Sequence, residues 1–347
     1  MSNLAEVIKN TVSGTRGEGP APDNTENKMN KIINYFARFL AVVVLLVMLG
    51  ISIYVSSEPE QFVIPNESNV TGYATLATLI KVADIMLHKP GGFMSNDIAP
   101  PYIFLDNIAA WEFGVLVQVR DLSRRLRQDM ARSLSQSKED ADLAVAEPFF
   151  SLGDDQWLFP ASEDEYRKGI KALERFQQRL IDPEQPTAQF YARADNLQNW
   201  LQDVGSRLGS LSQRLSASVG ARRINTDLAG DSAAKESTPT FREVAVKTPW
   251  YKIDDEFYEA RGTAWALVHF LKAIEVDFHD VLLKKNALTS LQQIIMELES
   301  SQVSMGSPLI LNGSGYGIFA NHSLVMANYI SRANAAIIDL RALLQQG

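Results

Sequence analysis

The feature that most constrains this chain is a run of seventeen residues, 39–55, without a charged side chain. At a rise of about 1.5 Å per residue, the run forms roughly 25 Å of apolar helix, slightly less than the hydrocarbon thickness of a bilayer. Residues 32–38 supply the missing length, because Arg38 can extend its guanidinium back to the headgroups. The sequence therefore predicts one transmembrane helix over residues 32–55, in contact with the lipid bilayer.

The charges on either side of this helix predict its orientation. Arg16, Lys28 and Lys31 precede the run, whereas residues 56–80 contain neither Lys nor Arg. The positive-inside rule then puts the N-terminus in the cytoplasm and the chain after residue 55 across the membrane. A cleavable signal sequence is the alternative, but its charged region would be nearly forty residues long and no Ala-x-Ala site follows the run. We expect an uncleaved, single-pass anchor.

The exported part is acidic. Residues 1–55 carry five Lys or Arg and four Asp or Glu, a net charge of +1, so the total of −8 leaves −9 on the remaining residues. An acidic domain without a basic stripe argues against nucleic acid as a partner. The chain has no cysteine, which excludes disulfides and thiol chemistry.

Polarity and periodicity divide the chain into five parts. Residues 1–31 are polar and rich in glycine and proline, which predicts a disordered cytosolic tail before the helix at 32–55. Apolar residues at steps of three and four then predict a first helical region over 56–219 and long helices over 250–347 of the same domain, with a polar linker at 220–249. The predicted fold is all-α: an elongated, coiled-coil-like helical bundle.

One antiparallel hairpin is predicted within the first helical region, over residues 162–218. Ser162 and Glu165 have the spacing of a capping box. From Phe190 to Leu215, apolar residues alternate at four and three, which is typical of a coiled-coil seam. Loops are expected at 91–101 and 136–161. The last helix, about 323–344, is apolar on nearly all sides, so we expect it to be the central, buried element.

The two halves of the chain share a short pattern. Pro101, Asp106 and Gly114 have the same spacing as Pro249, Asp254 and Gly262. This spacing suggests that each half consists of a helix, a loop and a long helix.

Residues that could carry chemistry are few. Paired carboxylates can hydrolyse glycosidic bonds, and the candidates are Asp106, Glu112 and Glu259. None forms a pair whose separation the sequence defines. The four histidines lack the partners of a metal site, because Glu275 and His279 have no third ligand nearby in the sequence. No metal and no cofactor is predicted.

A basic cluster is the most prominent candidate for binding. It comprises Arg120, Arg124, Arg125 and Arg127, with Arg132 beyond them. It would suit anionic lipid headgroups or an acidic partner, although pairing with Asp121 and Asp129 on the same helix is the alternative. The other candidate binding residues lie in or beside loops: Trp111, Trp250, Tyr258, Asn312 and His322.

Several segments resemble one bacterial family. They are 91–97 (GGFMSND), 111–116 (WEFGVL), 250–255 (WYKIDD), 258–262 (YEARG), 311–315 (LNGSG) and 320–329 (ANHSLVMANY). Together they resemble the proteobacterial family known as domain of unknown function 2333, over nearly the whole chain. The resemblance implies a protein of the Gram-negative inner membrane, with its C-terminal domain in the periplasm. The family has no assigned activity, so the resemblance transfers no functional residue.

Two functions are compatible with these features. The first is a membrane-anchored periplasmic scaffold or adaptor that acts through helix–helix contacts with a protein partner or with copies of itself. Its predicted surfaces are the seam from Phe190 to Leu215 and the basic cluster. The second is a periplasmic enzyme or ligand-binding domain, acting on cell-wall glycan. It requires the loops 91–101, 247–254 and 312–322 to converge on one cleft that contains a carboxylate.

Overall fold

The structure is a computed structural model, which describes residues 24–98, 100, 102, 105–133, 138–184, 187–224, 243–307, 309–314 and 317–346. The chain forms two compact units, 1–53 and 54–347. We describe each unit by itself and refer to the second as the body.

The described part of the first unit is the helix α2 (Asn24–Val55), whose last two residues belong to the body. Its residues 31–55 are long and apolar enough to cross a membrane, and none of the apolar window is buried. The helix begins at Asn24 rather than at residue 32, because Glu26, Lys28 and Met29 are good helix formers. Residues 1–23 of the predicted tail lie outside the described residues.

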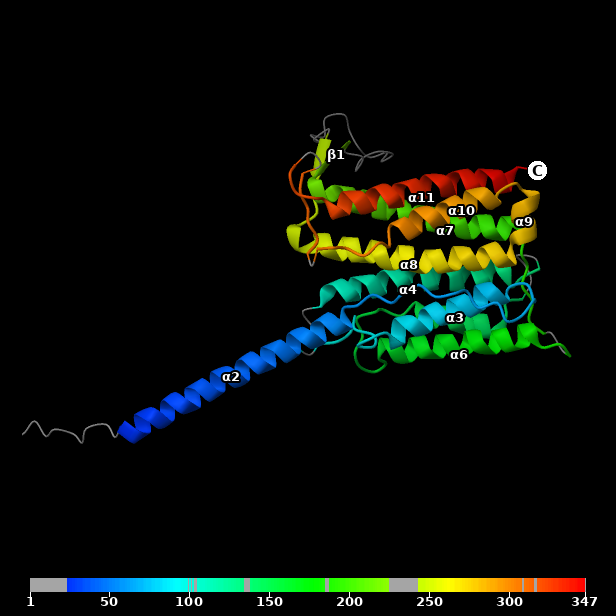
Figure 1. Cartoon of the computed structure of the whole chain (residues 1–347). Helices are drawn as coiled ribbons and strands as arrows, with labels where there is room; N and C mark the ends of the chain where they lie inside the picture. The colour runs from blue at the N-terminus through cyan, green and yellow to red at the C-terminus, as the bar shows by residue number, and fades with distance from the viewer. Residues whose placement is uncertain are drawn as a thin grey trace, which may run out of the picture. The chain divides into compact units, whose positions relative to one another are not determined.

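The body is a helical bundle, as predicted (Figure 1). Its first half contains α3 (Tyr73–His88), α4 (Asp106–Arg125), a π-helical turn η2 (Leu126–Met130), α5 (Ala141–Phe150) and α6 (Ser162–Ile181). Its second half contains α7 (Ala194–Ser216), η3 (Ala217–Val219), η4 (Trp250–Lys252), α8 (Ile253–Asp277), α9 (His279–Lys284), α10 (Leu288–Ser300) and α11 (His322–Gln345). The predicted linker contains an antiparallel pair, β1 (Ala221–Ile224) and β2 (Glu243–Val246), while residues 225–242 are not described.

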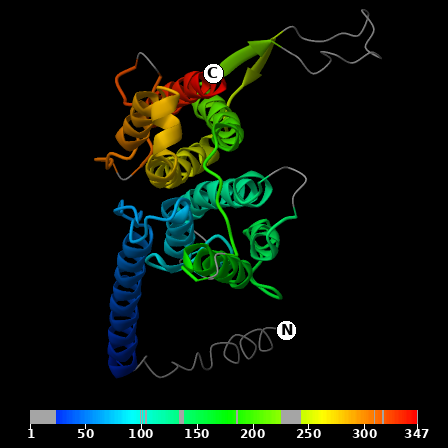
Figure 2. The ribbon, with the colours of Figure 1, turned by 90° about the vertical axis from the view of Figure 1, so that its right-hand side faces the viewer.

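The two halves repeat one arrangement of four helices. In the first half α3 packs on α6 and α4, and α5 packs on α4 and α6. In the second half α7 packs on α11 and α8, and α10 packs on α8 and α11. The helices therefore correspond as α3 with α7, α4 with α8, α5 with α10, and α6 with α11. In Figure 2 the helices of the second half lie above those of the first half.

The two halves meet along α4 and α8, where two glycines are in close contact with the opposite helix. A Cβ atom on Gly114 would overlap the carbonyl oxygen of Glu259, and one on Gly262 would overlap that of Trp111. Both pairs relate through one offset of 148 residues, which converts residue 111 into 259 and residue 114 into 262. This contact is that of a pseudo-twofold axis between two similar halves. It supports the repeat that the proline, aspartate and glycine spacing suggested.

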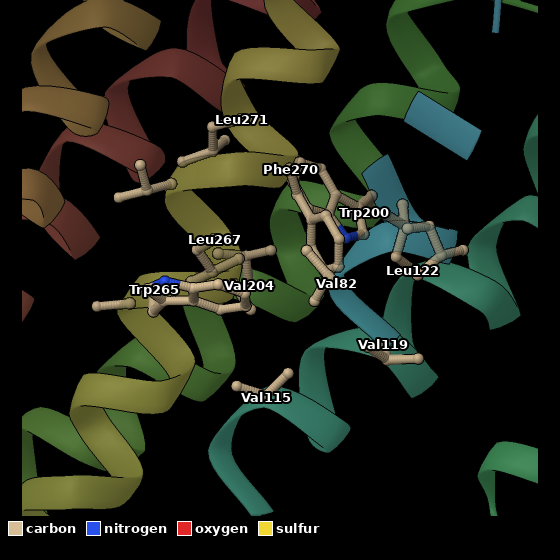
Figure 3. Packing of buried hydrophobic residues seen from close by; sticks show 14 of the residues in the cluster. Val82, Val115, Val119, Leu122, Trp200, Val204, Trp265, Leu267, Phe270 and Leu271 are labelled. Carbon is tan, nitrogen blue, oxygen red and sulfur yellow. The ribbon is translucent and has the colours of Figure 1, made fainter. Parts of the chain in front are cut away.

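Large apolar side chains fill the centre of the body from four helices. Val82 of α3, Leu122 of α4, Trp200 of α7 and Phe270 of α8 converge there and are fully buried (Figure 3). The central buried element is α8, of which sixteen residues are buried, and not the last helix as expected. Helix α11 buries one face and leaves Val325 and Ile338 exposed, because neighbours cover it on one side only.

The predicted hairpin of residues 162–218 is wrong. Helix α6 packs on α5 and α3 in one half, and α7 packs along α11 in the other. The connecting segment 187–193 is extended rather than a tight turn, and the backbone N–H of Tyr191 donates to the carbonyl of Met130 at the end of η2. The seam of α7 is buried within the chain against α11, which excludes it as a surface for partners.

Two local predictions also need correction. The segment 136–161, expected to be a loop, contains α5, whose N-terminus is capped by Asp140 through the backbone N–H groups of Asp142 and Leu143. Pro148 inside this short helix obscured its pattern. Ser162 is the first helical residue rather than a cap, and its hydroxyl donates to the carbonyl of Gly153.

An extended segment of residues 56–70, which we call the strap, lies along α8 on the side of α3. Glu58 pairs with the buried Arg261 at 2.6 Å. The ring of Phe62 stacks on His269 with the centroids 4.0 Å apart, and Lys81 of α3 lies 4.3 Å from its centroid. The N–H of Phe62 donates to Nε2 of His269 at 3.1 Å, so Nδ1 carries the proton that is donated to the carbonyl of Trp265. The strap thus lies between α8 of the second half and α3 of the first half.

Candidate functional site: a groove between α4 and α7

A polar groove of about 420 Å³ lies between α4 and α7, with Glu259 and Thr263 of α8 at one side. We call it the α4–α7 groove. Its size is within the range of small-ligand and peptide sites. The lining residues are Phe113, Val117, Gln118, Asp121, Arg124, Asp203, Ser206, Arg207, Ser210, Leu211, Arg214, Glu259 and Thr263.

Ion pairs between helices form the walls of the groove. Asp121 accepts hydrogen bonds from Arg124 at 2.8 Å and from Arg207 at 2.9 Å. Arg124 also reaches Asp203 on α7 at 3.1 Å. Burial alone would raise the pKa of Asp203, but the guanidinium groups beside it, Arg125 first, hold this pKa below its ordinary value. The walls therefore carry balanced charge, and the groove has no net sign to attract a simple ion.

Gln118 differs from these ion-paired groups, because both polar atoms of its side chain lack a partner, whereas Arg214 lacks one only at Nε. The side chain of Gln118 is 1% exposed and lines the groove. Within the described residues neither its amide oxygen nor its amide nitrogen has a hydrogen-bond partner. A buried, unsatisfied amide costs about 1–3 kcal/mol, so native proteins rarely keep one without a use. An amide with one free donor and one free acceptor matches the two hydrogen bonds of a peptide unit.

The pseudo-twofold axis relates the α4–α7 groove to the place between α8 and α3 that the strap fills. The offset of 148 residues converts Arg261, Trp265 and His269 into positions 113, 117 and 121, and all three of these line the α4–α7 groove. In the strap site a small number of α8 side chains bind an extended backbone and one aromatic ring. At position 117 a valine replaces the tryptophan, which leaves space.

The predicted basic cluster is paired within the chain. Arg125 binds Asp203 at 2.7 Å and Asp129 at 3.0 Å, and Arg127 lies 3.3 Å from Glu147. Arg120 donates to the carbonyls of Phe150 and Leu152 and so fixes the loop after α5. These contacts remove the basis for a lipid or partner patch. Of the four, only Arg124 lines the groove.

Glu112, a candidate catalyst, is fully buried and structural. It pairs with the equally buried Lys89 at 2.6 Å. Its carboxylate also accepts the backbone N–H groups of Met94 and Ser95, at 2.8 to 3.0 Å, and the Ser95 hydroxyl at 2.7 Å. Burial raises the pKa of Glu112, while Lys89 and these donors act in the opposite direction. The carboxylate holds the loop 89–97 on α4 and has no access to a substrate.

The remaining candidates do not gather in one place. Trp111 is buried against Trp265, with the ring centroids 5.2 Å apart, and Trp250 is exposed. Tyr258 and His322 line two neighbouring cavities, which share Arg261 and Met305. Asn312 donates to the carbonyl of Ser218.

Glu259 accepts hydrogen bonds from Arg214, and Asn321 caps α11 by accepting the backbone N–H of Leu324. Asn312 pairs with Asn321 across an isolated bridge. The described residues of the loops 91–101 and 312–322 are held on different halves of the body, the first by Glu112 of α4 and the second by contact with Ser218. The converging cleft of the enzyme hypothesis stays a prediction.

Asp106 lies beside the N-terminus of α8, because α4 and α8 run in parallel. Burial and the neighbouring charges of Asp106 and Asp254 raise the pKa of Asp255 to about 6. The folded body then keeps a proton that the unfolded chain releases at lower pH. This group therefore makes the body less stable as pH rises from about 4 to about 6.

Replacing Asp255 with asparagine should remove this slope and raise the free energy of unfolding at pH 7.5 by about 1 kcal/mol, after allowance for solvent screening. Urea unfolding at pH 4.5 and 7.5 measures the free energy of unfolding of both proteins, with Asp280→Asn at an exposed position as control. His269 acts in the opposite sense. Burial lowers its pKa to about 4, so its contribution is lost as pH falls from 6.5. The difference in unfolding free energy between wild type and Asp255→Asn isolates the contribution of Asp255. The same pH dependence in both proteins would contradict the raised pKa of Asp255.

Sequence reasoning missed Gln118, Asp203, Arg207 and Arg214. In the sequence each of them lies on a polar helix face, where such residues are ordinary surface groups. Only the packing of α7 against α4 brings them together. The spacing that repeats around Gly114 and Gly262 was the one available signal, since it marked the axis that relates the groove to the strap site.

The chain matches one family model. It is described as "Uncharacterized protein conserved in bacteria (DUF2333)" and covers residues 27–347. Neither a curated protein nor a solved structure matches the chain. Among the described residues no group of three or more His, Asp or Glu side chains is placed to hold a metal ion. The match extends over most of α2 and the whole body and confirms the resemblance of the motifs, so the chain belongs to this bacterial family, DUF2333.

Proposed function

We propose that this protein is a membrane-anchored adaptor of the bacterial cell envelope, whose body binds an extended segment of a partner protein in the α4–α7 groove. Helix α2 is the anchor. The distribution of Lys and Arg around it supports a cytoplasmic N-terminus and a periplasmic body. A reporter enzyme active only in the periplasm, fused at the C-terminus, should be active, and a fusion active only in the cytoplasm would overturn this orientation.

The observation that carries the proposal is the strap. On one side of the pseudo-twofold axis, the strap is an extended polypeptide bound along α8, and the α4–α7 groove is the related site on the other side. Along the strap, His269 accepts the N–H of Phe62 and Trp265 contacts the ring. On the other side Asp121 takes the position of His269, and the neighbouring Gln118 offers an unpaired donor and acceptor. Phe113, Val117 and Leu211 supply an apolar surface for one side chain of the segment.

This mode of contact replaces the helix–helix contact that the heptads suggested. The seam of α7 is buried and the arginines are paired, whereas the groove lies open at the surface. An extended segment gains main-chain hydrogen bonds there without displacing any helix. The rigid walls of ion pairs keep the groove in shape before binding, which reduces the entropy cost of association.

Site-specific photocrosslinking in intact membranes tests the proposal. A benzoylphenylalanine at Ser206 or Ser210 should crosslink to one contiguous segment of another envelope protein. A matched probe at Lys171, on the exposed face of α6, should not capture that segment. Val117→Trp, which restores the large residue of the strap site, should abolish the product by filling the groove.

A synthetic peptide of the captured segment then gives the affinity. Gln118→Ala should weaken its binding to the full-length protein roughly tenfold, since two hydrogen bonds are worth about 1.5 kcal/mol or more. Lys171→Ala should leave the Kd unchanged. Crosslinks that persist in Val117→Trp, or that arise only from a second copy of this chain, would overturn the proposal.

A further inference from the structure

Large apolar side chains stand in solvent at the tips of three loops of the body. Phe159, before α6, is 90% exposed; Ile318, before α11, is 99% exposed; and Trp250, before α8, is 84% exposed. Their neighbours Trp157, Leu158, Tyr251 and Phe319 are also exposed. We call these seven residues the apolar rim. Phe159 has a φ of 49°, a conformation that an aromatic residue rarely adopts. The surrounding loop therefore keeps Phe159 in an unfavourable backbone conformation while its side chain is exposed.

The loop of Trp157 and Phe159 is bound to the place where the chain enters the body. The side-chain amide of Asn96 donates to the carbonyl of Gln156 at 2.8 Å and to Glu163 at 2.6 Å. In the same loop as Asn96, Gly91 lies against Val55, since a Cβ atom there would be 2.9 Å from that of Val55. This part of the rim is therefore on the same side of the body as Val55, where the chain enters the body.

The second half of the rim is fixed at the same end. Arg261 binds Glu58, three residues after Val55, and also donates to the carbonyls of Ser301 and Val303, at 3.2 and 3.1 Å. Those carbonyls begin the segment that leads to Ile318. The loops before α6, α8 and α11 all lie at one end of the body (Figure 1).

The pseudo-twofold axis relates two of the loops that carry the apolar rim. The loop between α5 and α6 corresponds to the one between α10 and α11, and both present bulky apolar residues at their tips. Residues 156–160 and 317–319 contain no charge. Each large side chain that leaves water gains about 1.5–3 kcal/mol, so a common apolar environment would stabilise the whole rim.

We infer that the apolar rim dips into the interfacial layer of the same bilayer that α2 crosses, so that the body lies on the membrane by this end. The occupant is lipid rather than protein, because the chain runs from the rim's own end directly into an apolar helix. Trp, Tyr and Phe favour the headgroup boundary, where their rings are half buried in hydrocarbon. The inference rests on α2 as a membrane span and goes beyond the groove as a binding site.

The native tryptophans test it without a label. Helix α2 contains no tryptophan, and Trp111, Trp200 and Trp265 are buried in the body. The full-length protein is placed in nanodiscs of phosphatidylcholine whose acyl chains carry bromine close to the headgroups. The tryptophan fluorescence should be partly quenched there, because Trp157 and Trp250 lie near the bromine atoms. The quenching should disappear in the double variant Trp157→Phe, Trp250→Phe. Full quenching in that variant, or none in wild type, would overturn the inference.

Single cysteines give the depth of each loop, since the chain has no native cysteine. An environment-sensitive fluorophore on Phe159→Cys or Ile318→Cys should show blue-shifted emission in nanodiscs. The same fluorophore on Leu283→Cys, exposed on α9 beyond the C-terminal end of α8, should stay water-like. Equal, water-like emission at all three sites would refute the rim while the protein remains in the disc. Protein that alkaline carbonate extracts from membranes would instead refute α2 as the span.

Discussion

Replacing Gly262 with alanine should cost the body more than about 3 kcal/mol of unfolding free energy. The added methyl group would overlap the carbonyl oxygen of Trp111 and approach its Cα atom to 3.0 Å. These are backbone atoms of the opposite helix, so no rotamer change relieves the overlap and α4 must move away from α8. Gly114→Ala should cause a similar loss, because the pseudo-twofold axis places it against the carbonyl of Glu259.

Urea unfolding of the detergent-solubilised protein, followed by circular dichroism, measures both losses. Gly205→Ala is the matched control within a helix. Its new Cβ atom would be 3.4 Å from Asn334 and 3.5 Å from Ile337, which small side-chain shifts accommodate. Removal of a helical glycine contributes up to about 1 kcal/mol, so the control should be neutral or stabilising. Equal midpoints for Gly262→Ala and wild type would show that the α4–α8 contact is looser than described.

Lys89→Met should destabilise the body by about 3–5 kcal/mol. The substitution leaves the carboxylate of Glu112 buried without its counter-charge, and a lone buried charge is far more costly than the pair is favourable. Glu112→Leu should also destabilise the body strongly, because the N–H groups of Met94 and Ser95 lose their acceptor. The loop 89–97 should then detach from α4.

The same urea titration, combined with amide hydrogen exchange of the loop 89–97, measures this effect. The pair of the exposed Lys168 with the partly buried Glu165, 2.5 Å apart, is the control. Lys168→Ala should change the free energy of unfolding by less than about 0.5 kcal/mol, since surface pairs are screened by water. The double variant Lys89→Met, Glu112→Leu should be more stable than Lys89→Met alone, because no unpaired charge remains. A loss in Lys89→Met no larger than that of the control would contradict the buried pair.

The sequence by itself determined the local elements. The uncharged run of 39–55 predicted an apolar helix, because the length and composition of the run are read directly from the sequence and do not depend on tertiary contacts. The steps of three and four predicted the long helices and the all-α class. Such features depend on contacts within a few residues, which a single sequence contains in full.

Only the tertiary structure decided which helix packs on which. The apolar stripes of α6 and α7 suit any apolar partner, because hydrophobic burial is not directional. The extended segment between them carried α7 to α11 and left α6 with α3 and α5. The arginines of α4 were equally ambiguous until α7 placed Asp203 beside them. The α4–α7 groove, its unpaired Gln118 and the single end shared by the rim loops all follow from that packing, since each combines residues that the sequence keeps far apart.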